Sequence, residues 1–140
     1  MPATAAKPYE IKMLGEGVDA TAPDGTAVRL LLSLAGGSMA HFELPAGAVS
    51  HAVTHQTVEE IWFVVSGRGS IWRLQAGVES IDSLTPGTPL TIPLGTAFQF
   101  RADADMALAF VAITMPPWPG MDEAQPVAGP WEPNVAAGSA

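Results

Sequence analysis

Short apolar runs, broken by glycine and proline, make up most of the chain. Residues 28–34 and 38–44 flank Gly36-Gly37 and are predicted to form a hairpin, because paired glycines tolerate the positive φ of a tight turn. No long window keeps the i, i+3, i+4, i+7 apolar spacing of a helix without an intervening glycine or proline. The pattern therefore predicts an all-β sandwich or barrel with little helix. Further strands are predicted at 49–55, 60–66, 69–75, 89–92, 97–101 and 106–114, with a shorter one at 78–82.

The two ends of the chain differ from this central region. Residues 1–8 are expected to form a loose arm, and the apolar stretch from Tyr9 to Leu14 is expected to add to a sheet edge. The proline-rich segment after Met115 is predicted not to pair in a sheet, because proline lacks an N–H donor and fixes φ. Trp118 and Trp131 should hold it against the outside of a barrel, and the final AAGSA should be disordered. We therefore expect one domain over 1–140, with an arm at 1–25, a barrel at about 26–115 and a tail at 116–140.

The stretch from Pro45 to Gly69 collects two of the three histidines and two adjacent carboxylates. Side chains of a strand alternate between its faces, so His51, Val53 and His55 are predicted to share one face. The next run is rich in aromatic and β-branched residues and ends in a glycine turn, as a strand does. One of its faces is predicted to carry Glu60, Trp62 and Val64, and the other Glu59, Ile61, Phe63 and Val65.

This spacing resembles the first conserved motif of the cupins, G-x5-H-x-H-x4-E-x6-G, with Gly47, His55, Glu60 and Gly67 in place and Val53 where the first histidine belongs. The second motif, G-x5-P-x-G-x2-H-x3-N, is matched by Gly87, Pro93 and Gly95, with Phe98 and Ala102 in place of the histidine and the asparagine. The resemblance implies a small single-domain cupin of the type-2, RmlC-like jelly-roll family. It also implies a conical barrel of two sheets, with a turn at Pro93-Leu94-Gly95.

Resemblance to the cupins further implies a site for iron, manganese, nickel or zinc, held by three histidines and one glutamate. Only His55 and Glu60 remain of that set, because Val53 and Phe98 have no lone pair to donate, so the metal site is degenerate. His51 shares the strand face of His55 and would complete a two-histidine, one-carboxylate set. The α-carbons of residues four apart in a strand are separated by roughly 13 Å, so this set needs a bulge between them. We therefore expect no tightly bound metal, and His51, His55 and Glu60 as the ligands if one is bound.

The inward positions suggest an apolar pocket or a packed core. Replacing two ligand histidines by apolar residues dries the pocket, which should raise the pKa of Glu60 and lower that of His55, so that both can exchange protons with a substrate. A direct hydrogen bond between the two would instead favour their charged forms, and the sequence leaves both alternatives open. His41 is expected to be solvated. The predicted pocket wall is Val53, Trp62, Val64, Phe98 and Phe100, with Gln99 and Arg101 pointing outward.

Composition narrows the function classes. Six Lys and Arg residues against fourteen Asp and Glu give a net charge of −8, so nucleic acid is not an expected partner. The chain has no cysteine and no apolar run of membrane-helix length, and we expect a soluble, cytoplasmic protein without membrane contact. The exposed row of Ile61, Phe63 and Val65 favours a homodimer, as in many small cupins. Three functions remain: a metal-independent isomerase or lyase using His55 and Glu60, a metal-dependent dioxygenase or isomerase, and a non-catalytic binder of a small organic ligand.

Overall fold

Two antiparallel sheets form the protein in the computed structural model, which describes residues 6–120 and 122–139. The six-stranded sheet has the order β1-β2-β3-β10-β5-β8, and the five-stranded sheet has the order β11-β4-β9-β6-β7. Neither described range contains a helix, which confirms the all-β prediction, and therefore neither contains a helix able to cross a membrane. The strands are β1 Ala20–Thr21, β2 Ala27–Leu34, β3 Gly37–Leu44, β4 Val53–His55, β5 Glu59–Ser66, β6 Gly69–Gln75, β7 Val78–Leu84, β8 Pro89–Ile92, β9 Ala97–Ala102, β10 Leu108–Met115 and β11 Ala124–Pro126.

Trp62 on β5 fills the space between the two sheets. Exposed and buried residues alternate from Glu59 to Val64, which places Glu60, Trp62 and Val64 inside as predicted. The Trp62 ring stacks on Phe110 with their centroids 3.9 Å apart. Its edge-to-face partners are Phe98 and Phe100, at 5.7 and 5.2 Å. Aromatic pairs of this kind contribute about 0.5–1.5 kcal/mol each beyond the area they bury, so this cluster stabilises the barrel.

Glycines of the two motifs shape the turns between strands. Gly67 has a φ of 82°, and a Cβ atom there would lie 1.7 Å from the carbonyl oxygen of Ala107. Any other residue would therefore be excluded both by its backbone conformation and by this contact. In the predicted turn after β8, the N–H of Thr96 donates to the carbonyl oxygen of Pro93 over 3.1 Å, and Gly95 supplies the positive φ.

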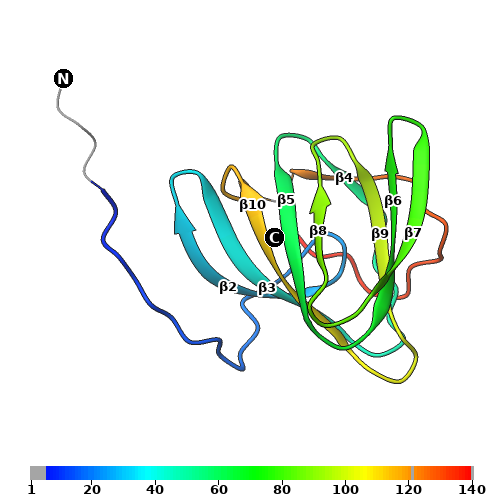
Figure 1. Cartoon of the computed structure of the whole chain (residues 1–140), viewed down its shortest axis with the longest axis horizontal. Coiled ribbons are helices and arrows are strands. Elements are labelled where there is room, and N and C mark those ends of the chain that lie inside the picture. The colour runs from blue at the N-terminus through cyan, green and yellow to red at the C-terminus, as the bar shows by residue number, and fades with distance from the viewer. Residues whose placement is uncertain (1–5, 121, 140) are drawn as a thin grey trace.

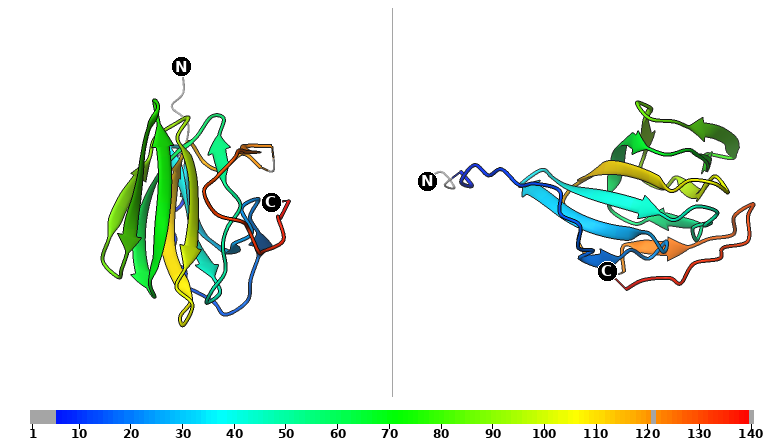
Figure 2. Two further views of the ribbon diagram at one scale, coloured as in Figure 1. Left: turned by 90° about the vertical axis from the view of Figure 1, so that its right-hand side faces the viewer. Right: turned by 90° about the horizontal axis from the view of Figure 1, so that it is seen from below.

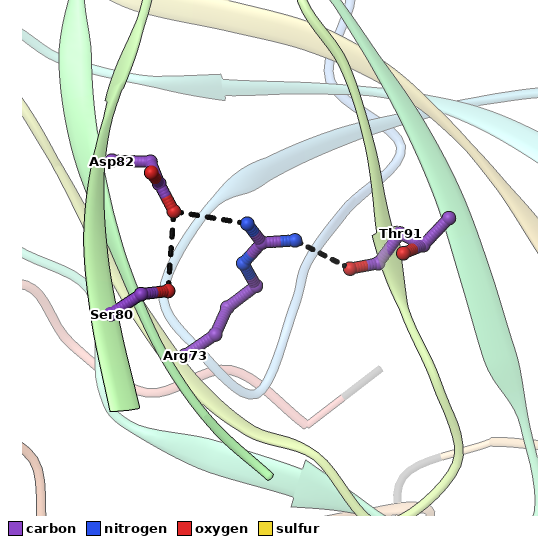
Figure 3. A network of polar contacts seen from close by, with 4 residues as sticks. All are labelled: Arg73, Ser80, Asp82 and Thr91. Atoms are coloured by element: carbon purple, nitrogen blue, oxygen red, sulfur yellow. Dashed lines mark hydrogen bonds and ion pairs between the residues drawn. The ribbon is translucent and has the colours of Figure 1, made fainter. Parts of the chain in front are cut away.

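Arg73 connects the two sheets at one edge (Figure 3). From β6, its Nη1 donates to the carbonyl oxygen of Thr91 on β8 over 2.9 Å, and its Nη2 donates to Oδ2 of Asp82 on β7 over 3.0 Å. The hydroxyl of Ser80 donates to the same carboxylate oxygen. Because β8 belongs to the other sheet, this network fixes the separation of the sheets at that edge.

The proline-rich tail does pair in a sheet, contrary to the prediction from its prolines. Ala124–Pro126 forms β11 and lies antiparallel to β4. The pairing continues on either side through the N–H of Gln56, which donates to Glu123, and the N–H of Val127, which donates to Ala52. Proline is tolerated because Pro126 ends a strand at the edge of the sheet, where its missing donor interrupts no ladder.

Beyond β11 the tail runs along the β4 and β9 side of the five-stranded sheet, away from β7 (Figure 2). Gln99 points outward as predicted but is buried, because its amide nitrogen donates to the carbonyl oxygens of Ser50 and Trp131 and its oxygen accepts from the N–H of Trp131. The guanidinium of Arg101 lies 4.1 Å from the ring centroid of Trp131, which confirms Trp131 as an outside anchor. The expected disorder of the last residues is wrong for Gly138, whose N–H donates to Ala22, while Ala140 lies outside the described residues.

The N-terminal arm runs away from the barrel (Figure 1). The expected edge strand between Tyr9 and Leu14 does not form, and Tyr9 and Ile11 are 101% and 94% exposed. Two lysines connect the arm to β2: Lys7 donates to the carbonyl oxygen of Ser33, and Lys12 donates to that of Leu30. These side-chain hydrogen bonds connect the arm to β2 in place of the backbone hydrogen bonds that a strand would make. Residues 1–5 of the expected loose arm lie outside the described residues.

Candidate functional site

A cavity of about 210 Å³ lies between the inner faces of β2 and β3, the loop before β2, and the tail. Its wall is mostly apolar. Polar groups enter it from Asp24, Ser38, His55, Glu60 and Thr114. An apolar cavity with a few convergent polar groups is the usual form of a small-molecule site. The remaining lining residues are Ala20, Ala22, Pro23, Val28, Leu30, Met39, Ala40, Phe42, Trp118 and Ala124.

Glu60 reaches the cavity from β5 and is 5% exposed. Its Oε1 accepts a hydrogen bond from Nε1 of Trp62, and its Oε2 accepts one from the hydroxyl of Thr114, both over 3.0 Å. Burial disfavours the charged carboxylate more than these two bonds favour it, and it raises the pKa of Glu60 to about 7. The nearby carboxyl groups of Asp24 and Glu123 act in the same direction. Glu60 therefore changes its charge close to neutral pH.

His55 reaches the same cavity from β4. Its ring meets Phe98 and Trp118 edge to face, with centroids 5.2 and 5.3 Å away. Burial lowers the pKa of His55 to about 4, against the opposing effect of the Glu123 carboxylate, so the imidazole is neutral at pH 7. Its Nδ1 is buried without a hydrogen-bond partner among the described residues. Because Glu60 is bonded to Trp62 and Thr114 and not to His55, the dry-pocket alternative describes this pair.

His51, the proposed third metal ligand, does not line this cavity. Its Nε2 lies 2.7 Å from the carbonyl oxygen of Val135 in the tail, a contact in which the imidazole is the donor. At the two ligand positions that carry no histidine, Val53 lies directly opposite Phe98 in the β4–β9 ladder. Within residues 6–120 and 122–139 no group of three or more His, Cys, Asp or Glu side chains could hold a metal ion. The donor set therefore does not fit the metal that the cupin resemblance implies.

The predicted pocket wall is also placed differently. Trp62, Phe98 and Phe100 pack against one another in the core, where each is at most 2% exposed. The cavity lies beyond this aromatic cluster, because the bulk of Trp62 fills the barrel interior. None of the five predicted residues lines the cavity: Val53, Trp62, Val64, Phe98 and Phe100.

Sequence reasoning missed Asp24, which lies in the loop before β2 and lines the cavity. Its Oδ1 accepts hydrogen bonds from the N–H and the hydroxyl of Thr26, over 3.0 and 2.6 Å. Burial raises the pKa of Asp24, although the bonds from Thr26 act against it. In the sequence, Asp24 belongs to an Asp-Gly pair followed by threonine. This pattern predicts a turn but does not indicate that the turn lines a cavity.

Two further residues differ from the sequence-based expectation. Trp118 was expected to anchor the tail outside the barrel, but it lines the cavity, and its N–H donates to the hydroxyl of Ser38 over 3.1 Å. His41 was expected to be solvated, but it is 6% exposed and its pKa is lowered by burial and by Arg29. His41 does not line the cavity and is not part of the site.

Glu123 holds the tail against the turn between β4 and β5. Its carboxylate accepts hydrogen bonds from the hydroxyl and the N–H of Thr57. Burial alone would raise the pKa of Glu123, but these bonds and further backbone donors lower it, so Glu123 is an anion at neutral pH. The bonds to Thr57 connect the tail to the turn that positions His55 and Glu60.

No protein-family model matches the chain, and no curated protein matches its sequence. Solved structures do resemble it. A variant of oxalate decarboxylase from B. subtilis superposes with a TM-score of 0.70 at 14% identity, covering 90% of this chain and 34% of that one. A predicted oxalate decarboxylase from Thermotoga maritima gives a TM-score of 0.63 at 16% identity, over 76% of this chain and 98% of that one. KdgF from Halomonas sp. superposes with a TM-score of 0.57 at 18% identity, covering 66% of this chain and 81% of that one. Likeness at these identities establishes the shared fold.

Proposed function

We propose that this chain, which has the cupin fold, binds a small, largely apolar organic molecule in the cavity and acts on it as a metal-independent isomerase or lyase. The cupin fold predicted from the two motifs is confirmed, and among proteins of this fold enzymes are common. One observation carries the proposal of chemistry. Glu60 lies in an apolar cavity with its pKa raised to about 7, where it can both take up and release a proton at neutral pH.

His55 supports a division of roles. A neutral imidazole can accept a proton on one ring nitrogen or donate one from the other. If Glu60 in its carboxylate form removes a proton from carbon, the C–H electron pair stays with the substrate, and His55 can stabilise the product or return a proton at another atom. Such a shift needs no oxidant and no metal. This reaction class is therefore compatible with the described residues, among which no donor set fits a metal ion.

Ligand binding is tested first, with 2-phenylethanol as a probe in isothermal titration calorimetry. Ala40 lines the cavity, so Ala40→Phe should fill it and abolish binding. Val78→Phe is the matched control, because Val78 is 74% exposed on β7 and should leave binding unchanged. Binding that survives Ala40→Phe would place the ligand elsewhere and contradict the proposal.

Proton transfer is tested with a panel of small apolar ketones in D₂O, followed by NMR. The wild-type protein should exchange protons next to the carbonyl for deuterium. Glu60→Gln should abolish the exchange while keeping ligand affinity, because the amide preserves shape and cannot take up a proton. Binding without exchange across the panel would reduce the function to that of a non-catalytic binder.

We also propose that two copies of the chain associate in the cytoplasm through the outer face of the six-stranded sheet. On β5, Ile61 and Phe63 are each 46% exposed and Val65 is 42% exposed. Ile113 of β10 lies directly beside Ile61 in the ladder and is 38% exposed. These four residues, named here the outer apolar row, form a contiguous apolar surface of the kind that marks a protein interface.

A further inference from the structure

Two carboxyl groups, those of Asp24 and Glu60, line the cavity, and no lysine or arginine of the described residues lies in its wall. The ion pairs of residues 6–120 and 122–139 join Lys7 to Glu10, Arg29 to Glu43 and Arg73 to Asp82, and none involves Asp24 or Glu60. Because His55 is neutral at pH 7, the residues that line the cavity offer its two carboxyl groups no countercharge.

Asp24 has an oxygen available for a ligand. Thr26 occupies Oδ1 through two hydrogen bonds, whereas no side chain in the described ranges donates to Oδ2. Glu60 differs, since each of its oxygens already accepts one hydrogen bond from the protein. A buried carboxylate needs a partner to offset the loss of its hydration. The arrangement therefore favours a donor that arrives with the ligand.

We propose that the cavity selects molecules that carry one positively charged amino group on a small apolar body, and that Asp24 receives this group. The inference rests on the proposed function, since it takes the cavity as the ligand site and names the class of ligand. Asp24 then acts as counter-ion and Glu60 remains free to transfer protons. Two carboxyl groups in one site thus have separate roles.

The size and lining of the cavity set the apolar part of the ligand. An engineered apolar cavity of about 150 Å³ holds benzene, so a cavity of about 210 Å³ accommodates one ring and a short chain. Phe42 and Trp118 contribute aromatic surface, and Val28 and Leu30 contribute aliphatic surface. The net charge of −8 further attracts a cationic ligand and repels an anionic one.

The experiment compares the affinities of three probes of similar shape by isothermal titration calorimetry at about pH 7.5. The probes are 2-phenylethylamine, 2-phenylethanol and 3-phenylpropanoate. The amine is protonated at this pH, as lysine is. We expect it to bind about tenfold more tightly than the alcohol, which corresponds to one favourable charge contact, and we expect the carboxylate not to bind. This comparison uses the wild-type protein and depends on no variant.

Asp24→Asn then tests whether the carboxylate of Asp24 receives the amino group of the ligand. The amide oxygen can still accept from Thr26, so the loop is retained, but the charge is lost. We expect the variant to lose most of the preference for the amine, and the remainder is the share of the Glu60 carboxyl group, which lines the same cavity. Asp105→Asn, which removes one exposed charge from the loop after β9, is the matched control and should keep the preference for the amine.

The pH dependence gives a second readout. Amine affinity should rise with pH as Asp24 ionises, and Asp24→Asn should remove its share of the rise. The titratable groups near Asp24 are Glu60 and His51, and His55 lines the same cavity. Equal binding of amine and alcohol by the wild-type protein would overturn the inference, while alcohol binding blocked by Ala40→Phe would leave the proposed function intact. Binding of none of the three probes would overturn both.

Discussion

Glu60 and His55 line one cavity without a hydrogen bond between them, so burial acts on each separately. The folded-state pKa of Glu60 rises from 4.5 to about 7, and that of His55 falls from 6.5 to about 4. Between pH 4.5 and 6.5 the glutamate is mostly ionised in the unfolded chain but protonated in the folded protein, and the histidine is mostly protonated in the unfolded chain but neutral in the folded protein. The two contributions to stability therefore have opposite slopes and nearly cancel in the wild-type protein.

Glu60→Gln should remove this cancellation. The histidine contribution then stands alone: it is present above pH 6.5 and is lost as the pH falls toward about 4. Relative to wild type, the free energy of unfolding should gain a positive slope of about 1.4 kcal/mol per pH unit in this window. Urea denaturation at several pH values measures the slope.

His55→Gln is the reciprocal control. The glutamate contribution that remains is lost as the pH rises from 4.5 to about 7, so stability should fall with pH in this variant. If both variants followed the wild-type pH dependence, the two groups would not be buried in the way described.

Thr114→Val should raise the pKa of Glu60 further. Valine has the shape of threonine without the hydroxyl that donates to Oε2, a bond that favours the ionised carboxylate. The variant should lose about 1 kcal/mol of stability above the pKa, where the bond is charge-assisted. An NMR titration of the Glu60 side-chain carboxyl carbon measures the shift, and an unchanged or lower pKa would show that Thr114 does not stabilise the anion.

Gln99→Leu should loosen the tail. The change leaves the carbonyl oxygens of Ser50 and Trp131 without their donor and should cost about 2 kcal/mol. The N–H of Val127, which bonds to Ala52, should then exchange with solvent faster in hydrogen-exchange measurements. Gln75→Leu, at an exposed position on β6, is the control and should have little effect.

Phe63→Glu should separate the proposed dimer, because it places a charge within the outer apolar row. We expect the dimer dissociation constant to rise at least about tenfold, measured by light scattering across a concentration series. Val78→Glu replaces an equally apolar, exposed residue on the other sheet and should leave the assembly intact. A wild-type protein of monomeric mass at micromolar concentration would rule out the dimer.

Strand alternation and glycine spacing were sufficient to predict the barrel, because the inward positions of β5 and the turn at Gly67 follow from local rules. The strand Ala124–Pro126 could not be predicted in this way. Its pairing depends on an open edge at β4 that only the folded barrel provides. The local sequence does not favour a strand at these residues, and the strand forms because the folded barrel offers β4 as a pairing partner.

The candidate site was predicted in part. His55 and Glu60 both line the cavity, since the motif strands direct them inward. Of the two alternatives for the inward aromatic residues, the packed core forms and the pocket wall does not, because the volume of Trp62 closes the barrel interior, a packing outcome that alternation does not reveal. Asp24 and Trp118 come from segments outside the two motifs, and no spacing rule connects them to Glu60.

The contribution of the tail to the cavity has a consequence for the order of assembly during synthesis. Once Met115 has left the ribosome, all strands from β1 to β10 are available, but Trp118, Ala124 and the segment that binds Ala22 have not yet emerged. The N-terminal part of a chain emerges first during synthesis and becomes available for folding before the rest. A nascent barrel can therefore form around its aromatic core while the cavity is still open on one side, and the cavity closes only when Trp118 and Ala124 dock.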